Sequence, residues 1–309
     1  MTSQARSRLL RAFAVLLGLV AAAALIELGL RLASVTITVT VRPPDNEVQT
    51  HFDDLIVCAG DSHTAGQGAP RGLGYPEQLE ALLNESRGGR ITRVINLGLG
   101  GQNSSEAADS VLAFLEHTPR APVAIIFNAG KNNDHNLRRA RIAPELVHEG
   151  DYRDWARYLL SESRAFRLSQ ITVRRLEGLA REERNTETLE YEDMLYVDGP
   201  GEIAMMRRWI EMDLDALAAR TSCPVVLLNY WTPVSWVDET FAAAATRPRF
   251  HFCDARAFGT DFSLEFIATA DITEKHLGGH PNERGYAVLA ELVGKLLREE
   301  ILPAAAPGI

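Results

Sequence analysis

A serine and a histidine far apart in the chain are the residues best suited to do chemistry together. Ser62 lies in the stretch CAGDSHTAG, and His280 lies in GGHPNERGY near the other end of the chain. A serine hydroxyl is a weak nucleophile until a base removes its proton and donors stabilise the oxyanion that its attack creates. We therefore expect Ser62 to attack a carbonyl carbon, with His280 as the general base.

Two further stretches offer donors for that oxyanion. NLGLGGQNS exposes the backbone of Gly98, Gly100 and Gly101, because glycine has no side chain to keep a ligand away from its N–H group. NAGKNND contributes Asn132, whose side-chain amide is a donor. Each stretch alone is common, but their occurrence in this order with the serine and the histidine predicts one site.

Three of these four stretches directly follow apolar runs that predict β-strands. Solid apolar strands separated by amphipathic helices are typical of a parallel sheet with both faces covered. Functional groups converge at the carboxyl ends of the strands in such sheets, and the three loops are expected there. The predicted strands are DLIVCAG (54–60), ITRVINLG (91–98), APVAIIFNAG (121–130), CPVVLLNYW (223–231) and FHFCDAR (250–256).

Helical spacing predicts helices at 75–84, 104–117 and 283–300. We expect Ser104 or Ser105 to cap the second of these helices, and Asn282 to cap the third and so to fix His280 in a short, rigid turn. Residues 137–212 interrupt the α/β pattern with a charged, helical segment. We interpret it as an insertion, which forms either a lid or rim of the site or a solvated excursion.

With the four stretches named, the chain resembles the SGNH, or GDSL, hydrolase superfamily over about Asp54 to Leu302. The resemblance implies a three-layer α/β/α fold around a central parallel sheet, of flavodoxin-like type. It implies that Ser62 is the nucleophile and His280 the base. It also implies an oxyanion hole made of the N–H groups of Ser62 and Gly101 and the side chain of Asn132, with Gly100 as the alternative glycine. No cofactor or metal is expected.

Two positions depart from the family pattern. Leu277 stands three residues before His280, where the family usually has an aspartate that orients the imidazole. Asp271 or Glu274 could fold back to take that role, or a backbone carbonyl could hold the ring and leave a Ser–His dyad. Asn133 replaces the aspartate that usually ends the third motif.

Other side chains near these motifs are candidates for the pocket wall or for ordinary packing. A metal pair of His276 with His280 is not expected, because the two glycines of HLGGH argue against a helix there. Tyr230, Trp231 and Trp236 follow the fourth strand and form either a substrate platform or packing at the sheet end. The candidate pocket residues are Gly100, His63, Lys131, Asn133, His276 and Trp231.

The N-terminal segment predicts a membrane anchor. Residues 12–30 are apolar except for Glu27, and about 20 such residues span a bilayer as a helix. Arg6, Arg8 and Arg11 precede it, which favours a cytoplasmic N-terminus and an extracytoplasmic catalytic domain. A cleaved signal peptide is the alternative. We expect a cytoplasmic stub at 1–8, a transmembrane helix at 9–33, a stalk at 34–53, a hydrolase domain at 54–303 and a tail at 304–309.

The composition limits the kinds of partner that the protein is expected to bind. The net charge of -9 and the lack of a Lys/Arg-rich run exclude a typical nucleic-acid-binding protein, and three separated cysteines make no disulfide framework. The expected partners are therefore a membrane and an ester substrate, either a small molecule or a glycan. The expected activity is ester hydrolysis through an acyl-serine, with O-acetyl groups of envelope or secreted glycans as candidate substrates. The alternatives are an O-acetyltransferase with the same site and a catalytically weak, membrane-tethered binding protein.

Overall fold

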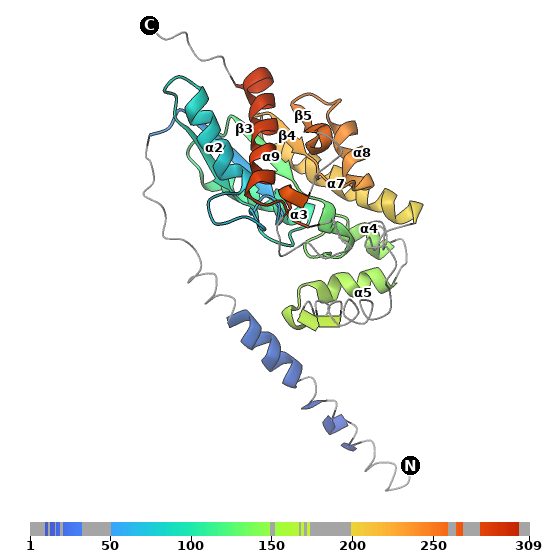
Figure 1. Cartoon of the computed structure of the whole chain (residues 1–309). Coiled ribbons are helices and arrows are strands. Elements are labelled where there is room, and N and C mark those ends of the chain that lie inside the picture. Colours follow the sequence, from blue (N-terminus) through green and yellow to red (C-terminus); the bar gives the residue numbers. More distant parts are fainter. Residues whose placement is uncertain are drawn as a thin grey trace. The chain divides into compact units, whose positions relative to one another are not determined.

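The structure is a computed structural model of the 309-residue chain. It describes residues 10–11, 13–15, 17–18, 21–32, 51–148, 152–166, 168–169, 172–173, 199–258, 264–267 and 279–302. The chain divides into two compact units (Figure 1). The larger unit comprises Thr50–Trp155 and Glu187–Ile309, and the smaller unit comprises Met1–Gln49 and Ala156–Thr186.

A five-stranded parallel sheet forms the centre of the larger unit in the part of the chain that the structure describes. Its strand order, β2-β1-β3-β4-β5, is the flavodoxin-like order in which ligands bind where the chain switches direction across the sheet. The strands are β1 (Asp54–Gly60), β2 (Thr92–Asn96), β3 (Ala124–Asn128), β4 (Val225–Leu228) and β5 (Phe250–Cys253). The parallel sheet predicted from the sequence is confirmed.

The helices and short helical turns connect and follow these strands. The α-helices are α2 (Tyr75–Ser86), α3 (Ser104–His117), α4 (Ala143–His148), α5 (Tyr152–Ser161), α7 (Pro200–Arg220), α8 (Ser235–Ala244) and α9 (Glu283–Leu296). The 3₁₀ turns are η1 (Lys131–Asp134), η3 (Ala255–Phe258) and η4 (Leu264–Phe266), and a π-helical turn, η6 (Leu297–Ile301), extends α9.

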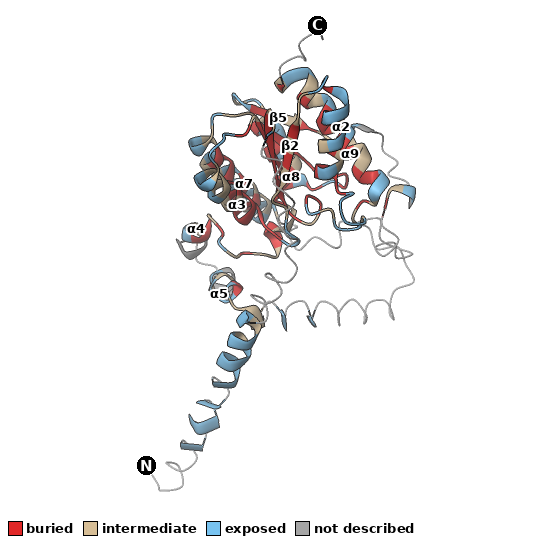
Figure 2. Ribbon diagram, turned by 90° about the vertical axis from the view of Figure 1, so that its left-hand side faces the viewer, coloured by how far each residue is buried: buried red, intermediate tan, exposed pale blue. Residues whose placement is uncertain are grey.

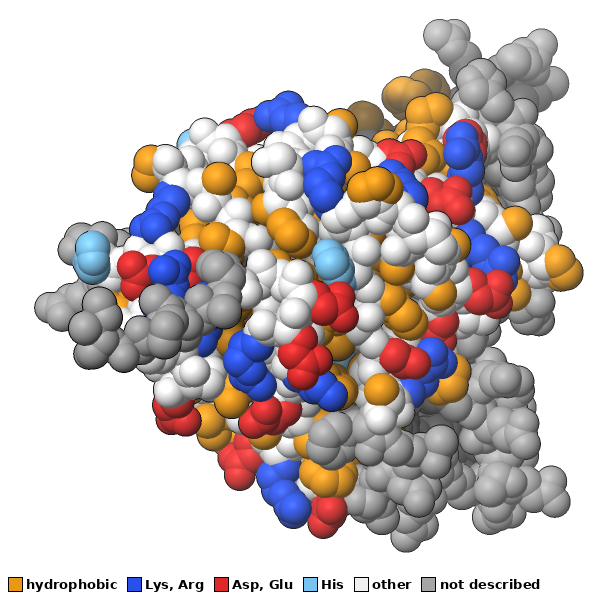
Figure 3. All heavy atoms as spheres, turned by 90° about the horizontal axis from the view of Figure 1, so that it is seen from above, with side chains coloured by type: hydrophobic (Ala, Val, Ile, Leu, Met, Phe, Trp, Pro, Cys, Tyr) orange, Lys and Arg blue, Asp and Glu red, His pale blue; other side chains and the backbone are white. Residues whose placement is uncertain are grey.

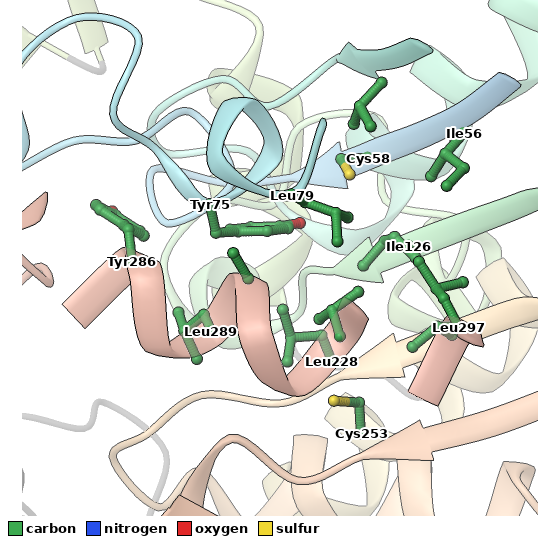
Figure 4. Packing of buried hydrophobic residues seen from close by; sticks show 14 of the residues in the cluster. Ile56, Cys58, Tyr75, Leu79, Ile126, Leu228, Cys253, Tyr286, Leu289 and Leu297 are labelled. Carbon is green, nitrogen blue, oxygen red and sulfur yellow. The ribbon is translucent and has the colours of Figure 1, made fainter. Parts of the chain in front are cut away.

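Helices α2 and α9 cover one face of the sheet. The side chains of Leu79 on α2 and Leu289 on α9 meet Ile56, Cys58 and Ile126 from the strands (Figure 4). Alternate residues of each strand point to this face, as the period of two residues along a strand requires. Cys58 and Cys253 are buried here as free thiols, and they pack as small apolar residues.

Helices α3, α7 and α8 cover the opposite face, so the larger unit has three layers (Figure 2). Phe127 of β3 packs against Phe241 of α8, with ring centroids 6.3 Å apart. Trp209 and Ile210 of α7 are fully buried in this layer. The three-layer α/β/α architecture expected from the sequence is therefore present.

Two local expectations differ from the structure. Asn103, not Ser104 or Ser105, caps α3, because its side chain accepts from the Glu106 N–H while Glu106 reaches back to the Asn103 N–H. The predicted insertion, 137–212, includes the first part of α7, whose buried residues belong to the core. In the sequence, the charged residues of α7 are interspersed with its apolar ones, so its buried face could not be recognised from the sequence alone.

The predicted anchor, 9–33, is described only in part, and residues 34–50 of the predicted stalk lie outside the described residues. The described residues between 10 and 32 are helical, and nearly all of them are exposed. No helix within the described ranges combines the length and the apolarity that crossing a bilayer requires.

The surface seen from above mixes positive, negative and apolar side chains (Figure 3). No field of one charge sign dominates this face.

Candidate active site

Ser62 lies just beyond β1, in a tight turn at the carboxyl-terminal edge of the sheet. The Ala65 N–H donates to the Asp61 carbonyl (2.9 Å), and the Gln67 N–H donates to the Ser62 carbonyl (3.0 Å). The turn begins at Gly60, where a Cβ atom would lie 2.1 Å from the Asn128 carbonyl oxygen. Only glycine fits there, so β1 can run close against β3 and deliver the serine directly at the sheet edge.

The structure brings Ser62 and His280 together. Nε2 of His280 lies 2.8 Å from Oγ of Ser62, although 218 positions separate the two residues in the chain. This is the distance of an ordinary hydrogen bond between a hydroxyl and an imidazole. His280 is therefore positioned to take the hydroxyl proton directly, without a bridging water.

The turn that carries His280 is held from both sides. As expected, Asn282 caps α9, and its side chain accepts from the N–H groups of Arg284 and Gly285. The Asn282 amide also donates to the carbonyls of Glu265 (2.7 Å) and Ile267 (3.1 Å). These four hydrogen bonds restrict the turn at residues 280–282, and with it the position of the imidazole.

The candidates for the orienting acid, Asp271 and Glu274, lie outside the described residues. The same holds for His276, the candidate pocket residue, and for Leu277. The predictions for these residues therefore stay predictions.

Asp61, the residue before the nucleophile, is a buried carboxylate that accepts three hydrogen bonds. Its donors are the His63 N–H (2.9 Å), the Tyr230 hydroxyl (2.6 Å) and the Asn132 side-chain amide (3.3 Å). Burial alone would favour the neutral acid, but His63 and the Tyr230 hydroxyl outweigh it and lower the pKa of Asp61. Asp61 is therefore an anion that ties together loops from three different strands.

Asn132 lies at this junction, close to the nucleophile turn. Its side-chain nitrogen donates to the Gln102 carbonyl (3.0 Å) as well as to Asp61. The loop is fixed from behind by Trp236, whose indole N–H donates to the Gly130 carbonyl (3.0 Å). The amide is thus held next to Asp61, the neighbour of Ser62 in the chain, and its longer bond, to Asp61, is the weaker of the two.

The glycine loop after β2 approaches the nucleophile without a side chain. A Cβ on Gly100 would lie 3.9 Å from the Ser62 Cβ, so a larger residue here would place its side chain against the serine. Gly101 has a φ of 77°, in the left-handed region that favours glycine. Both glycines that the sequence proposed as donors are therefore part of the site loop.

His63 is buried against His280, with 5% of its surface exposed. Its ring lies 5.0 Å from that of Tyr230, edge-on, and 5.1 Å from that of His280. Neither ring nitrogen has a hydrogen-bond partner, and Nδ1 lies 3.5 Å from Oδ1 of Asp61. Burial lowers the pKa of His63 and outweighs the attraction of Asp61, so the ring is neutral at neutral pH.

The other candidate pocket residues have different roles. Asn133 is fully buried and exchanges hydrogen bonds with Ser104, so it fastens η1 to the start of α3 and does not face the site. Trp231 belongs to the core cluster, which favours the packing interpretation. Lys131 holds its ammonium 5.7 Å from the centre of the Tyr230 ring, at the site's edge.

Tyr230 and Asp61 are the functional residues that sequence reasoning undervalued. Tyr230 was one of three aromatic residues after β4, and the pattern there could not show that its hydroxyl meets a carboxylate 169 positions away. The signal available in the sequence was a tyrosine at the carboxyl end of a central strand. Among the described residues, no group of three His, Cys, Asp or Glu side chains could hold a metal ion.

With this geometry in place, the chain can be compared with known proteins. No family model matches it, and no curated protein matches its sequence. Several solved structures are similar in fold. One is a member of the lipolytic G-D-S-L family from Veillonella parvula, with 14% identity and a TM-score of 0.46 over 80% of this chain and 100% of that chain.

Two further structures are similar to the same extent. A putative arylesterase from Agrobacterium tumefaciens has 16% identity and a TM-score of 0.41, over 81% of this chain and 100% of its own. A family 3 carbohydrate esterase from Clostridium thermocellum has 14% identity and a TM-score of 0.43, over 78% of this chain and 94% of its own. At such low scores and identities the function has to be argued from the site itself.

Proposed function

We propose that the protein is a serine esterase of the SGNH type that hydrolyses an ester through an acyl-Ser62 intermediate. The observation that carries the proposal is the 2.8 Å contact between Nε2 of His280 and Oγ of Ser62. An imidazole at this distance is the arrangement that activates a serine hydroxyl in acyl transfer. The complementary donors that we propose are the backbone of the Gly100–Gly101 loop and the amide of Asn132, which is bonded to Asp61 next to the serine in the chain.

The reaction has two steps. His280 takes the Ser62 proton while Oγ attacks the ester carbonyl, and the imidazolium then gives that proton to the leaving alcohol. In the second step His280 removes a proton from water, which attacks the acyl-serine and releases the acid. The N–H groups of Ser62 and Gly101 and the Asn132 amide would stabilise both tetrahedral oxyanions.

Asn132 has to change partners during these steps. Both of its amide hydrogens have acceptors in the resting site, the Gln102 carbonyl and the Asp61 carboxylate. The 3.3 Å bond to Asp61 is the one that an oxyanion would replace at the lower cost, since Asp61 keeps two other donors. The retained bond to Gln102 would hold the amide plane during the exchange.

Substrate and location are proposed from the sequence and the site together. The arginines that precede the apolar segment 12–30 favour an anchored protein with the catalytic unit outside the cytoplasm. Esters available there include O-acetyl groups on envelope or secreted glycans, and we propose these as the substrate class.

The decisive experiment is labelling of the full chain with a fluorophosphonate probe, beside hydrolysis of an aryl acetate. Wild type should react with the probe, and Ser62→Ala should not. His280→Ala should lower kcat/KM by at least about 10⁴-fold. A folded wild type that neither reacts with the probe nor turns over any ester would leave the binding protein as the better assignment. Addition of sugar acceptors would show transfer in place of hydrolysis.

A further inference from the structure

The smaller unit contains a polar contact between the N-terminal helix and the segment after α5. Glu27 is the one acidic residue of the apolar stretch 12–30. Its carboxylate accepts from the Ser163 hydroxyl (3.0 Å), the Ala165 N–H (3.0 Å) and Arg31 (2.7 Å). A charge on an otherwise apolar helix is therefore matched by donors more than 130 positions away.

The contact also satisfies the ends of two helices. Ser163 accepts from the Phe166 N–H (3.2 Å), so it caps the helical turn that starts at residue 164, and Glu27 places a negative charge at that start. In return, Arg164 donates to the Leu30 carbonyl (3.1 Å) at the carboxyl end of the N-terminal helix. Each helix end thus receives the charge that its dipole favours, and we call this set of contacts the Glu27 clasp.

The residues around the clasp leave large apolar side chains uncovered. Leu159 and Leu160 of α5 are 53% and 46% exposed, and Leu168 and Val173 beyond it are 50% and 51% exposed. Trp155 lies one turn before Leu159 on the same helix and is 42% exposed. The N-terminal helix likewise leaves Leu25, Ile26, Leu28 and Leu32 exposed. Exposed apolar side chains in such numbers mark an interaction surface.

The net positive charge of the segment 152–173 indicates which kind of partner its exposed apolar side chains would bind. Residues 152–173 contain four arginines (153, 157, 164 and 167) and two acidic residues (154 and 162), in a chain whose net charge is -9. A basic, amphipathic helical segment with tryptophan and leucine on its apolar side is typical of a segment that lies in the bilayer interface. Anionic phospholipid fits both its charge and its apolar side chains.

We infer that the segment 152–173 lies in the interface of an anionic phospholipid bilayer, docked by the Glu27 clasp on the helix that anchors the protein. It would form a second membrane attachment, and it would place Glu27 at the depth where the apolar helix leaves the lipid. The inference rests on the proposed N-terminal anchor and assigns a role to the insertion that the esterase chemistry leaves unexplained.

Tryptophan fluorescence tests this inference directly. The full chain is reconstituted in vesicles of phosphatidylglycerol and phosphatidylcholine with brominated acyl chains, which quench tryptophans at bilayer depth. The other three tryptophans, Trp209, Trp231 and Trp236, are buried in the larger unit, so quenching reports Trp155. We expect the brominated lipid to quench part of the wild-type emission, and Trp155→Phe to abolish that loss.

A matched pair of substitutions controls for charge. Leu159→Glu places an acid on the proposed surface, whereas Leu73→Glu places it at an exposed leucine (38%) of the larger unit. We expect Leu159→Glu to remove most of the Trp155 quenching and Leu73→Glu to leave it unchanged. Equal quenching in wild type and Trp155→Phe would overturn the inference, as would equal effects of the two glutamates.

Flotation of the same vesicles tests the N-terminal anchor independently of the interfacial segment. A chain that floats with the vesicles but shows no Trp155 quenching is anchored, and the interfacial segment is then wrong. A chain that does not float overturns the anchor and the inference together. Hydrolysis of a soluble ester is measured in parallel, so loss of the esterase function would be visible independently of either result.

Discussion

Asp61 shows how a residue beside the nucleophile can organise a site without touching the reacting atoms. Its buried carboxylate receives Tyr230 from the loop after β4 and Asn132 from the turn after β3. A buried anion that loses one donor keeps the cost of its desolvation, so its bonds are interdependent. The carboxylate should therefore matter to catalysis through the orientation of Asn132.

Replacement of Asp61 tests that role. Asp61→Asn keeps one acceptor oxygen but offers an N–H group where Tyr230 or Asn132 also donates, so the amide of Asn132 should lose its orientation. We expect kcat/KM to fall by about 10²-fold, close to the loss of one oxyanion donor. KM should change little, because substrate binding does not use this carboxylate. Steady-state kinetics on an aryl acetate measures both.

Tyr230→Phe is the graded control for this prediction. It removes one of three donors and leaves Asn132 bound to Asp61, so we expect only about a tenfold loss. If Tyr230→Phe were as damaging as Asp61→Asn, the carboxylate would act through the tyrosine and not through Asn132.

His63 should make the stability of the protein depend on pH. Its folded pKa lies below the ordinary 6.5, so the unfolded chain binds a proton more readily. Stability is therefore lost as pH falls from about 7 through 6.5 and toward the folded pKa. The charged or titratable groups that face the ring are Asp61, Lys131, His280 and Tyr230, and of these Lys131 and His280 add to the shift.

Urea unfolding at pH 7.5 and pH 5.5 checks this expectation. His63→Phe keeps an aromatic ring against Tyr230 and removes the titrating group, so it should lose less stability between the two pH values than wild type does. Exposed His117 on α3 provides the comparison, and His117→Gln should follow wild type. A wild-type slope that survives in His63→Phe would assign the acid sensitivity to another group.

At the residue scale, the sequence was sufficient to predict the residues that belong to short, local motifs. Ser62, His280 and the Asn282 cap follow from short stretches whose chemistry is complete within a few residues. The Asp61–Tyr230 bond could not be predicted, because it depends on the register of β4 beside β3 and on the length of the loop beyond it. Asn133 was assigned to the pocket because only its position, and not its direction, could be read.

At the scale of elements, the α3–α7 interface contains a buried acid that the catalytic proposal does not use. Asp213 of α7 is fully buried and accepts from the Ser105 hydroxyl (2.8 Å), with Arg141 2.7 Å away. Burial raises the pKa of Asp213 to about 7, against the lowering effects of Ser104, Ser105 and Arg141. Ionisation of this group near neutral pH should therefore weaken the packing of α7.

The sign of the effect follows from the raised pKa. The folded protein binds the proton more tightly than the unfolded chain, so the stabilisation is complete below about 3.8 and is lost as pH rises through about 7. Asp213→Asn should flatten this dependence and gain stability over wild type at pH 8, by up to about 4 kcal/mol. Urea unfolding at pH 5 and pH 8 measures it.

Asp215→Asn is the matched control on the same helix. Asp215 is exposed and pairs with Arg247, so its replacement should change stability by less than about 1 kcal/mol and leave the pH dependence intact. A similar change in both variants would show that α7 is insensitive to the ionisation of the buried acid.

The elements themselves were predicted as far as their apolar pattern is regular. Strands with continuous apolar runs and helices with a clear stripe were found within a few residues. The first part of α7, up to residue 212, was assigned to the insertion because seven of the 21 residues of this helix are charged, and only packing shows that Trp209 and Ile210 face the core. The cap of α3 was misplaced by one residue because Asn103, Ser104 and Ser105 are all good caps.

At the scale of the whole molecule, the chain passes between its two units three times. The proposed catalytic residues Ser62, Asn132 and His280 all belong to the larger unit, and the Glu27 clasp belongs to the smaller one. The larger unit therefore connects to the smaller one through two separate parts of the chain, the stretch before residue 50 and the ends of the segment 156–186. This arrangement gives the proposed membrane attachment two independent routes.

Cleavage of the link between the N-terminal helix and the larger unit tests the attachment through the segment 152–173. A protease site placed within 34–49 would cut the covalent link between the N-terminal helix and the larger unit, and the segment 152–173 with its Glu27 clasp would then be the remaining attachment of the larger unit. We expect the cleaved protein to stay on phosphatidylglycerol vesicles at about 0.05 M salt, and to leave them at about 0.5 M salt as screening weakens the attraction of the arginines. Vesicles of phosphatidylcholine alone should release it at both concentrations.

Sedimentation measures the bound fraction, and hydrolysis of a soluble ester should stay within about twofold of the uncut protein. Complete release from anionic vesicles at low salt would show that the covalent link to the N-terminal helix alone holds the enzyme to the membrane.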